Sequence, residues 1–270
     1  PLSFMLILQK LLWEIYWYNF TMRIVSRLDI KNDYLIKGLA LEGLRKLGNA
    51  KDFAKKYYQF GIDEIIYIDT VASLYSREGI FKILMETVQE VFVPITVGGG
   101  IRTVNDAYKY FDHGADKIFI NTAAVENPEI IDKLVNKFGS ANITLSVETI
   151  KDQEGETWGV YTSNGRDKSN KELSEWILEA TERGVGEIFI TSVNFDGFQQ
   201  GFDYELMSHI LSISNLPVVL SGGFGQIKHL ENLSQKLSGI AVGSSLHYGK
   251  IEILEIKDKL KSMNFEVRNE

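Results

Sequence analysis

Cysteine is absent from this sequence of 270 residues, and its absence excludes several kinds of chemistry. Without thiols the chain can form no disulfide, hold no metal through thiolates and use no cysteine nucleophile. Histidine is scarce, and the spacing of the four histidines matches no pattern of metal ligands. These are His113, His209, His229 and His247. We therefore expect them to be surface or packing residues, and we expect no metal and no other cofactor.

Positive charge in blocks and long apolar runs are also lacking. The net charge is -7 without a long basic block, so neither nucleic acid nor an anionic membrane surface is an expected partner. Residues 1–21 are rich in apolar and aromatic side chains, but Lys10 and Glu14 interrupt them before a run of about 20 apolar residues is reached. They also lack the cleavage pattern of a signal peptide. We expect a cytoplasmic protein with one domain over residues 22–270 and an extension over 1–21; an interfacial helix is the alternative for the extension.

Two stretches of the chain repeat one pattern. "VPITVGGGIRT" begins at Val93 and "LPVVLSGGFGQ" begins at Leu216, which places their prolines 123 residues apart. Glu64 in "GIDEIIYIDT" and Glu187 in "GVGEIFITSV" have the same separation. The order of glycine, glutamate, apolar run and proline-led run is the same in both copies. The sequence therefore indicates two duplicated halves.

Short apolar runs alternate with amphipathic stretches, which is typical of parallel β/α units. Eight strands are expected, near residues 22–29, 64–68, 95–97, 117–120, 144–148, 187–191, 218–220 and 239–242. Eight such units in about 250 residues predict a (β/α)8 TIM barrel built from two half-barrels. Hydrophobic residues make up 44% of the chain, which is enough for one large core. A doubly wound open sheet is the alternative, but it gives no reason for two equal halves.

Glycines and small polar residues follow the predicted strands of both halves. In a barrel of this kind the chemistry lies at the C-terminal ends of the strands, where backbone without side chains can approach a phosphate closely. Two such cradles predict a small-molecule substrate with a phosphate at each end. The predicted cradle residues are Gly99, Gly100, Asn121 and Thr122 in the first half, and Ser221, Gly222, Gly223, Ser244 and Ser245 in the second.

Carboxylates end two of the predicted strands on opposite sides of the barrel mouth. Asp29 ends the first strand and Glu148 the fifth. A general acid and a general base that face each other across a bis-phosphate site can move protons in opposite steps of one reaction. Asp69, Asn194 and Asp196 lie at other strand ends, where they would orient substrate hydroxyls or cap the following helices.

Several longer motifs identify a resemblance that runs from Met22 to about Leu260. They are "TVGGGIR", "GADK", "INTAAVENPE", "FGS", "YTSNGR", "GEIFITS", "SGG", and "DG" followed by "GFD". The chain resembles the cyclase subunit of imidazole glycerol phosphate synthase, from the histidine biosynthesis family. The resemblance implies a barrel that takes ammonia from a partner glutaminase in a heterodimer. With an aminated ribulosyl phosphate, such a barrel makes imidazole glycerol phosphate and an aminoimidazole carboxamide nucleotide.

The resemblance also implies roles for particular residues. Asp29 matches the family's catalytic aspartate, and Glu148 stands where a second aspartate is usual. The substrate residues then include Lys37, Thr191 and Asp196. The family carries a ring of charges at the N-terminal end of the barrel, where ammonia enters, and a residue beside it that contacts the glutaminase. The ring here would be Arg23, Glu64, Lys117 and Glu187, and the contact residue Asp116. Charges inside a barrel need partners, so a purely structural plug would look the same.

Departures from the family pattern lie around the substrate. Ser26 and Arg27 replace a proline and a cysteine, Asn194 replaces an aspartate, and Glu148 is one methylene longer than usual. The first loop, "KGLALEGLRKLG", keeps Lys37 but lacks the usual asparagine and phenylalanine. These changes keep an alternative open, namely a divergent barrel that uses channelled ammonia to form an acetamidino group on a sugar for surface polysaccharides. Two further alternatives are the related isomerase, which needs no ammonia entrance, and a non-catalytic scaffold for a glutaminase.

Overall fold

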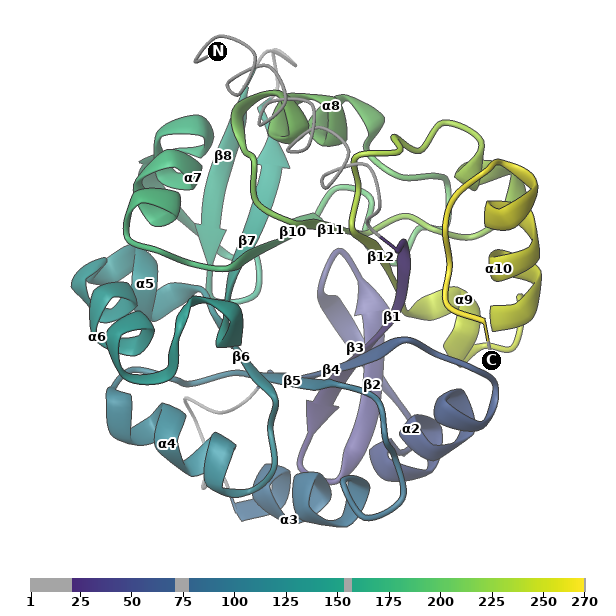
Figure 1. Ribbon diagram of the computed structural model, residues 1–270, viewed down its shortest axis with the longest axis horizontal. Helices are drawn as coiled ribbons and strands as arrows, with labels where there is room; N and C mark the ends of the chain where they lie inside the picture. The colour runs from purple at the N-terminus through teal and green to yellow at the C-terminus, as the bar shows by residue number, and fades with distance from the viewer. Residues whose placement is uncertain (1–20, 71–77, 153–156, 270) are drawn as a thin grey trace, which may run out of the picture.

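A computed structural model of the chain describes residues 21–70, 78–152 and 157–269. Eight parallel strands form the centre of the molecule. They are β1 (Arg23–Lys31), β4 (Glu64–Asp69), β5 (Ile95–Gly98), β6 (Lys117–Ile120), β7 (Ile143–Lys151), β10 (Glu187–Ser192), β11 (Val218–Ser221) and β12 (Gly239–Val242). Each pairs with its neighbours, and the pairings of β7 with β10 and of β12 with β1 close the ring (Figure 1). The predicted (β/α)8 barrel is confirmed, with all eight strands where the apolar runs placed them.

The helices lie outside the ring of strands (Figure 1). They are α2 (Ala50–Gln59), α3 (Glu78–Thr87), α4 (Val104–Asp112), α5 (Thr122–Glu126), α6 (Glu129–Phe138), α7 (Leu173–Glu182), α8 (Tyr204–Ile213), α9 (Ser244–His247) and α10 (Ile253–Ser262), with 3-10 turns η1 (Ser140–Asn142) and η2 (Ile227–Leu230). A capping box between Thr103 and Asp106 starts α4. Helix α6 buries Ile130, Ile131 and Leu134 on one face, as its amphipathic sequence requires. Between β11 and β12 the turn η2 takes the place of a full helix.

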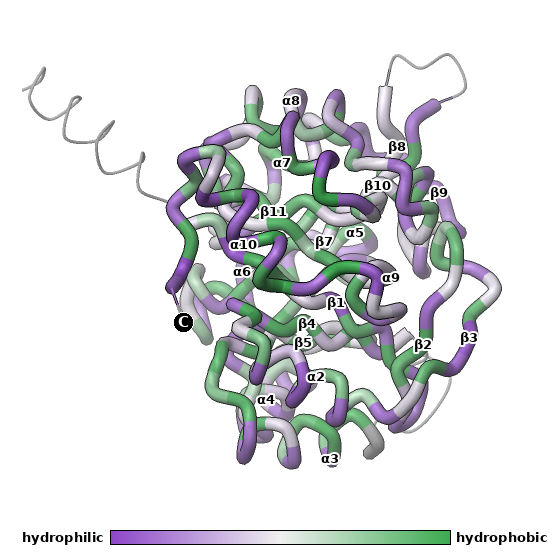
Figure 2. Tube along the Cα trace, turned by 90° about the vertical axis from the view of Figure 1, so that its right-hand side faces the viewer, coloured by the Kyte–Doolittle hydropathy of each residue, from purple (hydrophilic) through white to green (hydrophobic). Residues whose placement is uncertain are grey.

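Two antiparallel hairpins, which the sequence analysis did not predict, extend the barrel. The first consists of β2 (Tyr34–Leu39) and β3 (Glu42–Asn49), and it continues from β1. The second consists of β8 (Trp158–Thr162) and β9 (Asp167–Glu172), and it continues from β7. Figure 2 shows both on the same side of the molecule. Each half-barrel therefore begins with a strand followed by a hairpin, which repeats the duplication at the level of elements.

The duplication also appears in how two glycines pack. Gly99 and Gly222 have φ values of +110° and +101°, a region that side chains rarely adopt. A Cβ on Gly99 would lie 2.4 Å from the Asp69 carbonyl oxygen, and one on Gly222 would lie 2.7 Å from that of Ser192. Asp69 and Ser192 are themselves 123 residues apart. The repeated glycines thus have a packing role that does not depend on any ligand.

Alternation along the strands divides the core into two parts. Along β1, Ile24 and Leu28 face the surrounding helices and belong to the large core between strands and helices. Val25 faces the barrel interior, where it joins a separate apolar cluster. The members of this interior layer are Val25, Ile66, Ile68, Phe119, Phe189, Val219 and Ala241, and all are buried. Polar groups occupy the interior on both sides of this layer, at the two ends of the barrel.

Candidate active site

Asp29 lies at the C-terminal end of β1, and two cations hold its carboxylate. Its Oδ1 accepts a hydrogen bond from Arg27 Nε at 2.9 Å, and its Oδ2 accepts one from Lys37 Nζ at 3.3 Å. Lys37 reaches this position from β2 of the first hairpin. Burial opposes ionisation of Asp29, but Arg27 and Lys37 outweigh it and lower the pKa of the carboxyl to about 2. Asp29 is therefore an anion at neutral pH.

Glu148 lies on β7, and its surroundings differ from those of Asp29. The backbone N–H of Gly165, in the turn of the second hairpin, donates a hydrogen bond to Glu148 Oε2 at 2.8 Å. Glu148 is only 7% exposed and makes no ion pair within the described parts of the chain. Burial raises the pKa of Glu148 to about 7, and the opposing effects of Arg27 and the Gly165 N–H are smaller. One of the two candidate catalytic carboxyls is thus poised to gain or lose a proton near neutrality.

Arg27 crosses the barrel interior beneath the mouth. It is 4% exposed, and its Nη1 lies 3.2 Å from Thr191 Oγ1 and 3.5 Å from Ser221 Oγ. Burial disfavours its charge, but Asp29 and Asp196 raise the pKa of the guanidinium further, so it stays protonated. Sequence reasoning noted Arg27 as a departure but gave it no role. The signal was a basic residue two positions before Asp29, on the same inward face of the strand.

Lys37 and Asp196 meet at the mouth, and their contact fastens the first hairpin to the barrel. Lys37 Nζ lies 3.0 Å from Asp196 Oδ2. The backbone N–H of Ala40, at the hairpin's tip, donates to the Asp196 carbonyl oxygen at 2.9 Å. Lys37 is therefore shared between two carboxylates that come from β1 and from the loop after β10. The hairpin of the first half therefore contacts the loop after β10 in the second half.

A small pocket opens beside this cluster. It brings together most of the residues predicted for the cradle of the second half. The lining residues are Ser221, Gly222, Gly223, Ser244, Gly243, Phe224 and Ala241, with Arg27, Lys37 and Asp196. Ser245 was also predicted for this cradle, but it does not line the pocket. It is fully buried, and its hydroxyl has no hydrogen-bond partner among the residues that the structure describes.

The cradle predicted for the first half lies beneath the second hairpin. Tyr110 Oη donates to the Gly99 carbonyl oxygen at 3.0 Å, which fixes the turn that continues into Gly100. Asn121 Nδ2 lies 3.4 Å from the Tyr161 carbonyl oxygen, and Thr122 Oγ1 accepts from the Ser163 N–H at 3.3 Å. The second hairpin therefore contacts the predicted cradle of the first half.

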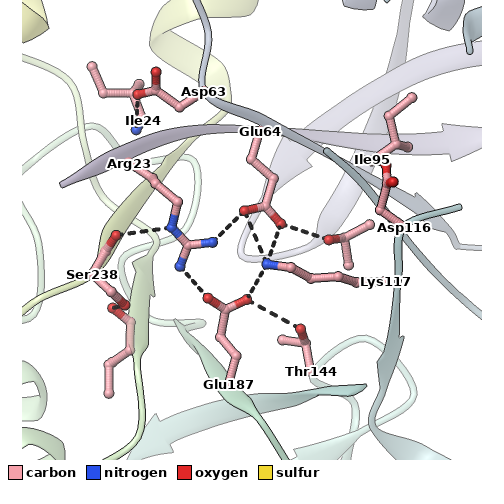
Figure 3. Close-up of polar contacts among 12 residues, drawn as sticks. Arg23, Ile24, Asp63, Glu64, Ile95, Asp116, Lys117, Thr144, Glu187 and Ser238 are labelled. Atoms are coloured by element: carbon pink, nitrogen blue, oxygen red, sulfur yellow. Dashed lines mark hydrogen bonds and ion pairs between the residues drawn. The ribbon is translucent and has the colours of Figure 1, made fainter. Parts of the chain in front are cut away.

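The four predicted ring residues meet at the starts of their strands, at the end of the barrel opposite Asp29 (Figure 3). Arg23 donates to both Glu64 and Glu187. Lys117 Nζ lies 3.3 Å from Glu64 Oε1 and 3.2 Å from Glu187 Oε2. Burial opposes ionisation of Glu187, but Arg23 and Lys117 outweigh it and lower its pKa. In this structure two cations and two anions form a closed ring of ion pairs.

Two further threonines complete the hydrogen bonds of the ring. Thr96 Oγ1 donates to Glu64 at 2.7 Å, and Thr144 Oγ1 donates to Glu187 at 3.3 Å. Asp116 lies beside the ring at the surface, where its Oδ2 accepts from the Ile95 N–H at 2.8 Å (Figure 3). Asp116 therefore has a structural role at the start of β5, and its carboxylate also remains accessible at this end of the barrel.

The histidines were expected to be surface or packing residues, and His247 is a packing residue. Its Nε2 donates to the Arg27 carbonyl oxygen at 3.0 Å, and its Nδ1 accepts from Tyr57 Oη at 2.7 Å. Burial lowers the pKa of His247 to about 4, so the ring is neutral. Among the described residues no group of three or more histidines and carboxylates could hold a metal ion. In the same parts of the chain, no helix has the length and apolar character that crossing a membrane requires.

The closed barrel, with two unlike carboxyls and a pocket at the C-terminal ends of its strands, defines a (β/α)8-barrel enzyme. The chain belongs to the histidine biosynthesis protein family, whose model matches residues 23–252. Several relatives carry the name imidazole glycerol phosphate synthase subunit HisF. That of Legionella pneumophila is 46% identical over 206 residues, which cover 76% of this chain and 97% of the relative. Those of Petrotoga mobilis and Pyrococcus furiosus are 38% and 39% identical, over 92% and 91% of this chain and 99% and 98% of the relatives.

Proposed function

We propose that this chain is the cyclase subunit of an imidazole glycerol phosphate synthase. In this function it combines ammonia with an aminated ribulosyl phosphate at the mouth of the barrel and releases imidazole glycerol phosphate, an aminoimidazole carboxamide nucleotide and one water molecule. The observation that carries the proposal is the layering of the barrel interior. A charged ring lies at one end, an apolar layer in the middle, and the two carboxyls at the other end.

The apolar layer suits the passage of neutral ammonia. Phe119 and Phe189 pack edge to face within it, with ring centroids 4.8 Å apart. Burying an unpaired charge in such surroundings costs many kcal/mol, so ammonium and hydronium are disfavoured there. A small uncharged molecule does not meet that penalty. Passage requires the ring of ion pairs and the apolar side chains to move aside for ammonia.

The ammonia would come from a separate glutaminase bound at the charged end of the barrel. The chain has no cysteine, so it cannot hydrolyse glutamine by the thiol route. Delivery through a dry interior would also protect a reactive intermediate at the mouth from water. The partner would surround the ring and contact the exposed carboxylate of Asp116. We propose a heterodimer that works in the cytoplasm.

The substrate would span the mouth with one phosphate at each cradle. In the second half, Gly222, Gly223 and Ser244 line the pocket beside two cations, Arg27 and Lys37. Backbone N–H groups without side chains, together with fixed positive charge, favour a phosphate. In the first half, Gly99, Gly100, Asn121 and Thr122 would hold the other phosphate beneath the second hairpin. Asp29 and Glu148 then lie between the two phosphates.

Sugar amidination, the alternative considered for the sequence, gains no support from the relatives reported above. Each of them carries the name of the histidine-pathway subunit.

A direct assay tests the proposed function. The purified chain is given excess ammonium salt and the aminated ribulosyl phosphate, and the products are separated by chromatography. We expect imidazole glycerol phosphate and the aminoimidazole nucleotide in equal amounts. The Asp29→Asn variant serves as the matched control, and its turnover is expected to fall by about 10²-fold or more, because the change removes a charge at the reacting centre. A folded chain that binds the substrate without converting it would contradict the proposal.

A further inference from the structure

Arg27 lies next to the apolar layer of the barrel interior, on the side of the mouth. It follows Val25 of that layer by two positions on β1, so both side chains point inward. Its partner Thr191 likewise follows Phe189 of the layer by two positions on β10. Strands β11 and β12 lie between β10 and β1 in the ring, so the arginine side chain crosses the barrel.

Three contacts hold the guanidinium in this position. Nε donates to Asp29 Oδ1 at 2.9 Å, and Nη1 lies 3.2 Å from Thr191 Oγ1 and 3.5 Å from Ser221 Oγ. Arg27 also lines the pocket at the mouth, beside Ala241, which belongs to the apolar layer as well. A molecule that leaves the apolar layer for the pocket therefore meets the guanidinium.

The chemistry of a guanidinium distinguishes ammonia from ammonium. Arginine offers five N–H donors and no acceptor, and it carries a positive charge. Ammonia has a lone pair and can accept a hydrogen bond from such a donor. Ammonium has no lone pair, and its charge is repelled. An arginine that projects into a narrow passage excludes cations in this way in membrane channels.

The charges around Arg27 keep the mouth balanced as long as the arginine is present. Asp29 contacts both Arg27 and Lys37, and Lys37 also contacts Asp196 from the loop after β10. Without the charge of Arg27, Lys37 would face these two carboxylates alone. The pocket end of the apolar layer would then attract cations.

We propose that Arg27 determines selectivity at the exit of the ammonia passage, where it lets neutral ammonia reach the mouth and excludes ammonium and other cations. The proposal rests on the proposed function, because it concerns the same passage. It places a second point of control at the mouth, opposite the ring of ion pairs. Cations from the solvent at the mouth are kept out of the apolar layer by the same charge.

The lack of cysteine allows a direct test that needs neither substrate nor glutaminase. Ala241→Cys introduces one thiol where the apolar layer meets the pocket. Its rate constants are measured with a neutral reagent, methyl methanethiosulfonate, and with a cationic one, 2-aminoethyl methanethiosulfonate. The ratio of the cationic to the neutral rate constant is independent of how far the thiol is ionised, so it reports whether positive charge is excluded. An exposed thiol from Ser212→Cys gives the reference ratio.

We expect the ratio at Ala241→Cys to be about fivefold or more below the reference when Arg27 is present. Arg27→Met keeps the length of the side chain but removes the charge, and it is expected to raise the ratio by about the same factor. Arg27→Lys keeps a cation and is expected to preserve most of the native selectivity. An unchanged ratio in Arg27→Met would overturn the inference. Equal ratios at the two thiols with Arg27 in place would overturn it too, and this comparison remains if Arg27→Met does not fold.

The isotope content of the product tests the same role during turnover. The complex with the glutaminase receives glutamine labelled with ¹⁵N in its amide, together with unlabelled ammonium salt. Mass spectrometry then gives the labelled fraction of imidazole glycerol phosphate. We expect this fraction to be several-fold lower in Arg27→Met than in the native chain, because ammonium and water from the mouth then mix with the channelled ammonia.

Glu148→Gln is the matched control for this measurement. It is expected to slow turnover while the three contacts of Arg27 stay in place, so its labelled fraction should remain close to that of the native chain. An equal fall in both variants would contradict the inference, because slow turnover alone would then explain the loss of label. A complex that makes no product from either nitrogen source would overturn the proposed function, while the thiol ratios would still decide whether Arg27 excludes cations.

Discussion

At the scale of the residue, the presence or absence of neighbouring cations decides the protonation of each carboxyl of the mouth. Arg27 and Lys37 turn the buried carboxyl of Asp29 into a stable anion. Glu148 is buried to a similar degree, but a backbone N–H replaces the cation. Opposite charge therefore outweighs burial at one site and not at the other. Ionisation of the buried Glu148 carboxyl should therefore lower the stability of the fold.

Glu148→Gln is expected to stabilise the protein at alkaline pH. A carboxyl whose pKa is raised on folding contributes stability below its unfolded value of 4.5, and that contribution is lost as the pH rises through about 7. Glutamine carries no charge to bury and can still accept from the Gly165 N–H. We expect the free energy of unfolding at pH 8 to increase by about 2 kcal/mol, with little change at pH 4.5. Urea denaturation at both pH values measures the free energy of unfolding of the native chain and the variant. The exposed Glu182→Gln is the control, and an equal effect at both pH values would exclude the proposed cause.

At the scale of the element, the barrel strands could be predicted from the sequence because each contains a short, mostly apolar run. Burial on both faces requires such runs, so β4, β5, β11 and β12 were readily predicted. The two hairpins escaped prediction because their outer strands are polar. The residues of β3 and β9 are mostly exposed and have no apolar run, so no periodicity identifies them as strands.

Local sequence patterns also limited what could be predicted about the site. The sequence placed Asp29, Glu148 and the glycines at the C-terminal ends of strands, because strand ends follow from apolar runs. It could not predict that the Gly165 N–H would bind Glu148 or that Lys37 would join Asp29 to Asp196. Those contacts depend on how the two hairpins fold over the mouth. The ring of charges was predictable only through the family resemblance, since ion pairing between distant strands leaves no local pattern.

The turns after β5 and β11 yield a prediction about the repeated glycines. Gly222→Ala forces a Cβ to within 2.7 Å of the Ser192 carbonyl oxygen at a φ of +101°. Gly249 also has a positive φ, +63°, but nothing lies within 4 Å of the position of its Cβ. We expect Gly249→Ala to lower the free energy of unfolding by about 1 kcal/mol and Gly222→Ala to lower it by roughly 2 to 4 kcal/mol. Thermal or urea denaturation compares the stabilities of the two variants. Equal losses would show that the close approach at Gly222 is relieved by small movements of the turn.

At the scale of the whole molecule, the barrel joins two polar ends through a dry centre. Arg23, Glu64, Lys117 and Glu187 close one end, and Arg27, Asp29 and Glu148 occupy the other. The first hairpin contacts the loop after β10 and the second contacts Thr122 of the first half, so the mouth is built jointly by both halves. The proposed function requires ammonia to travel along this axis from a docked glutaminase to the mouth.

Lys117→Met in a complex with the glutaminase tests this requirement most directly. The change removes one of the two cations that join Glu64 to Glu187, so the entrance no longer closes as a ring of ion pairs. The measurement compares imidazole glycerol phosphate formed per glutamine hydrolysed with the rate obtained from free ammonium salt, and the exposed Lys133→Met is the control. We predict that the yield from glutamine changes several-fold while the rate with free ammonia stays close to that of the native chain. Equal loss with both nitrogen sources would contradict the account, because it would show that the ring only holds the barrel together.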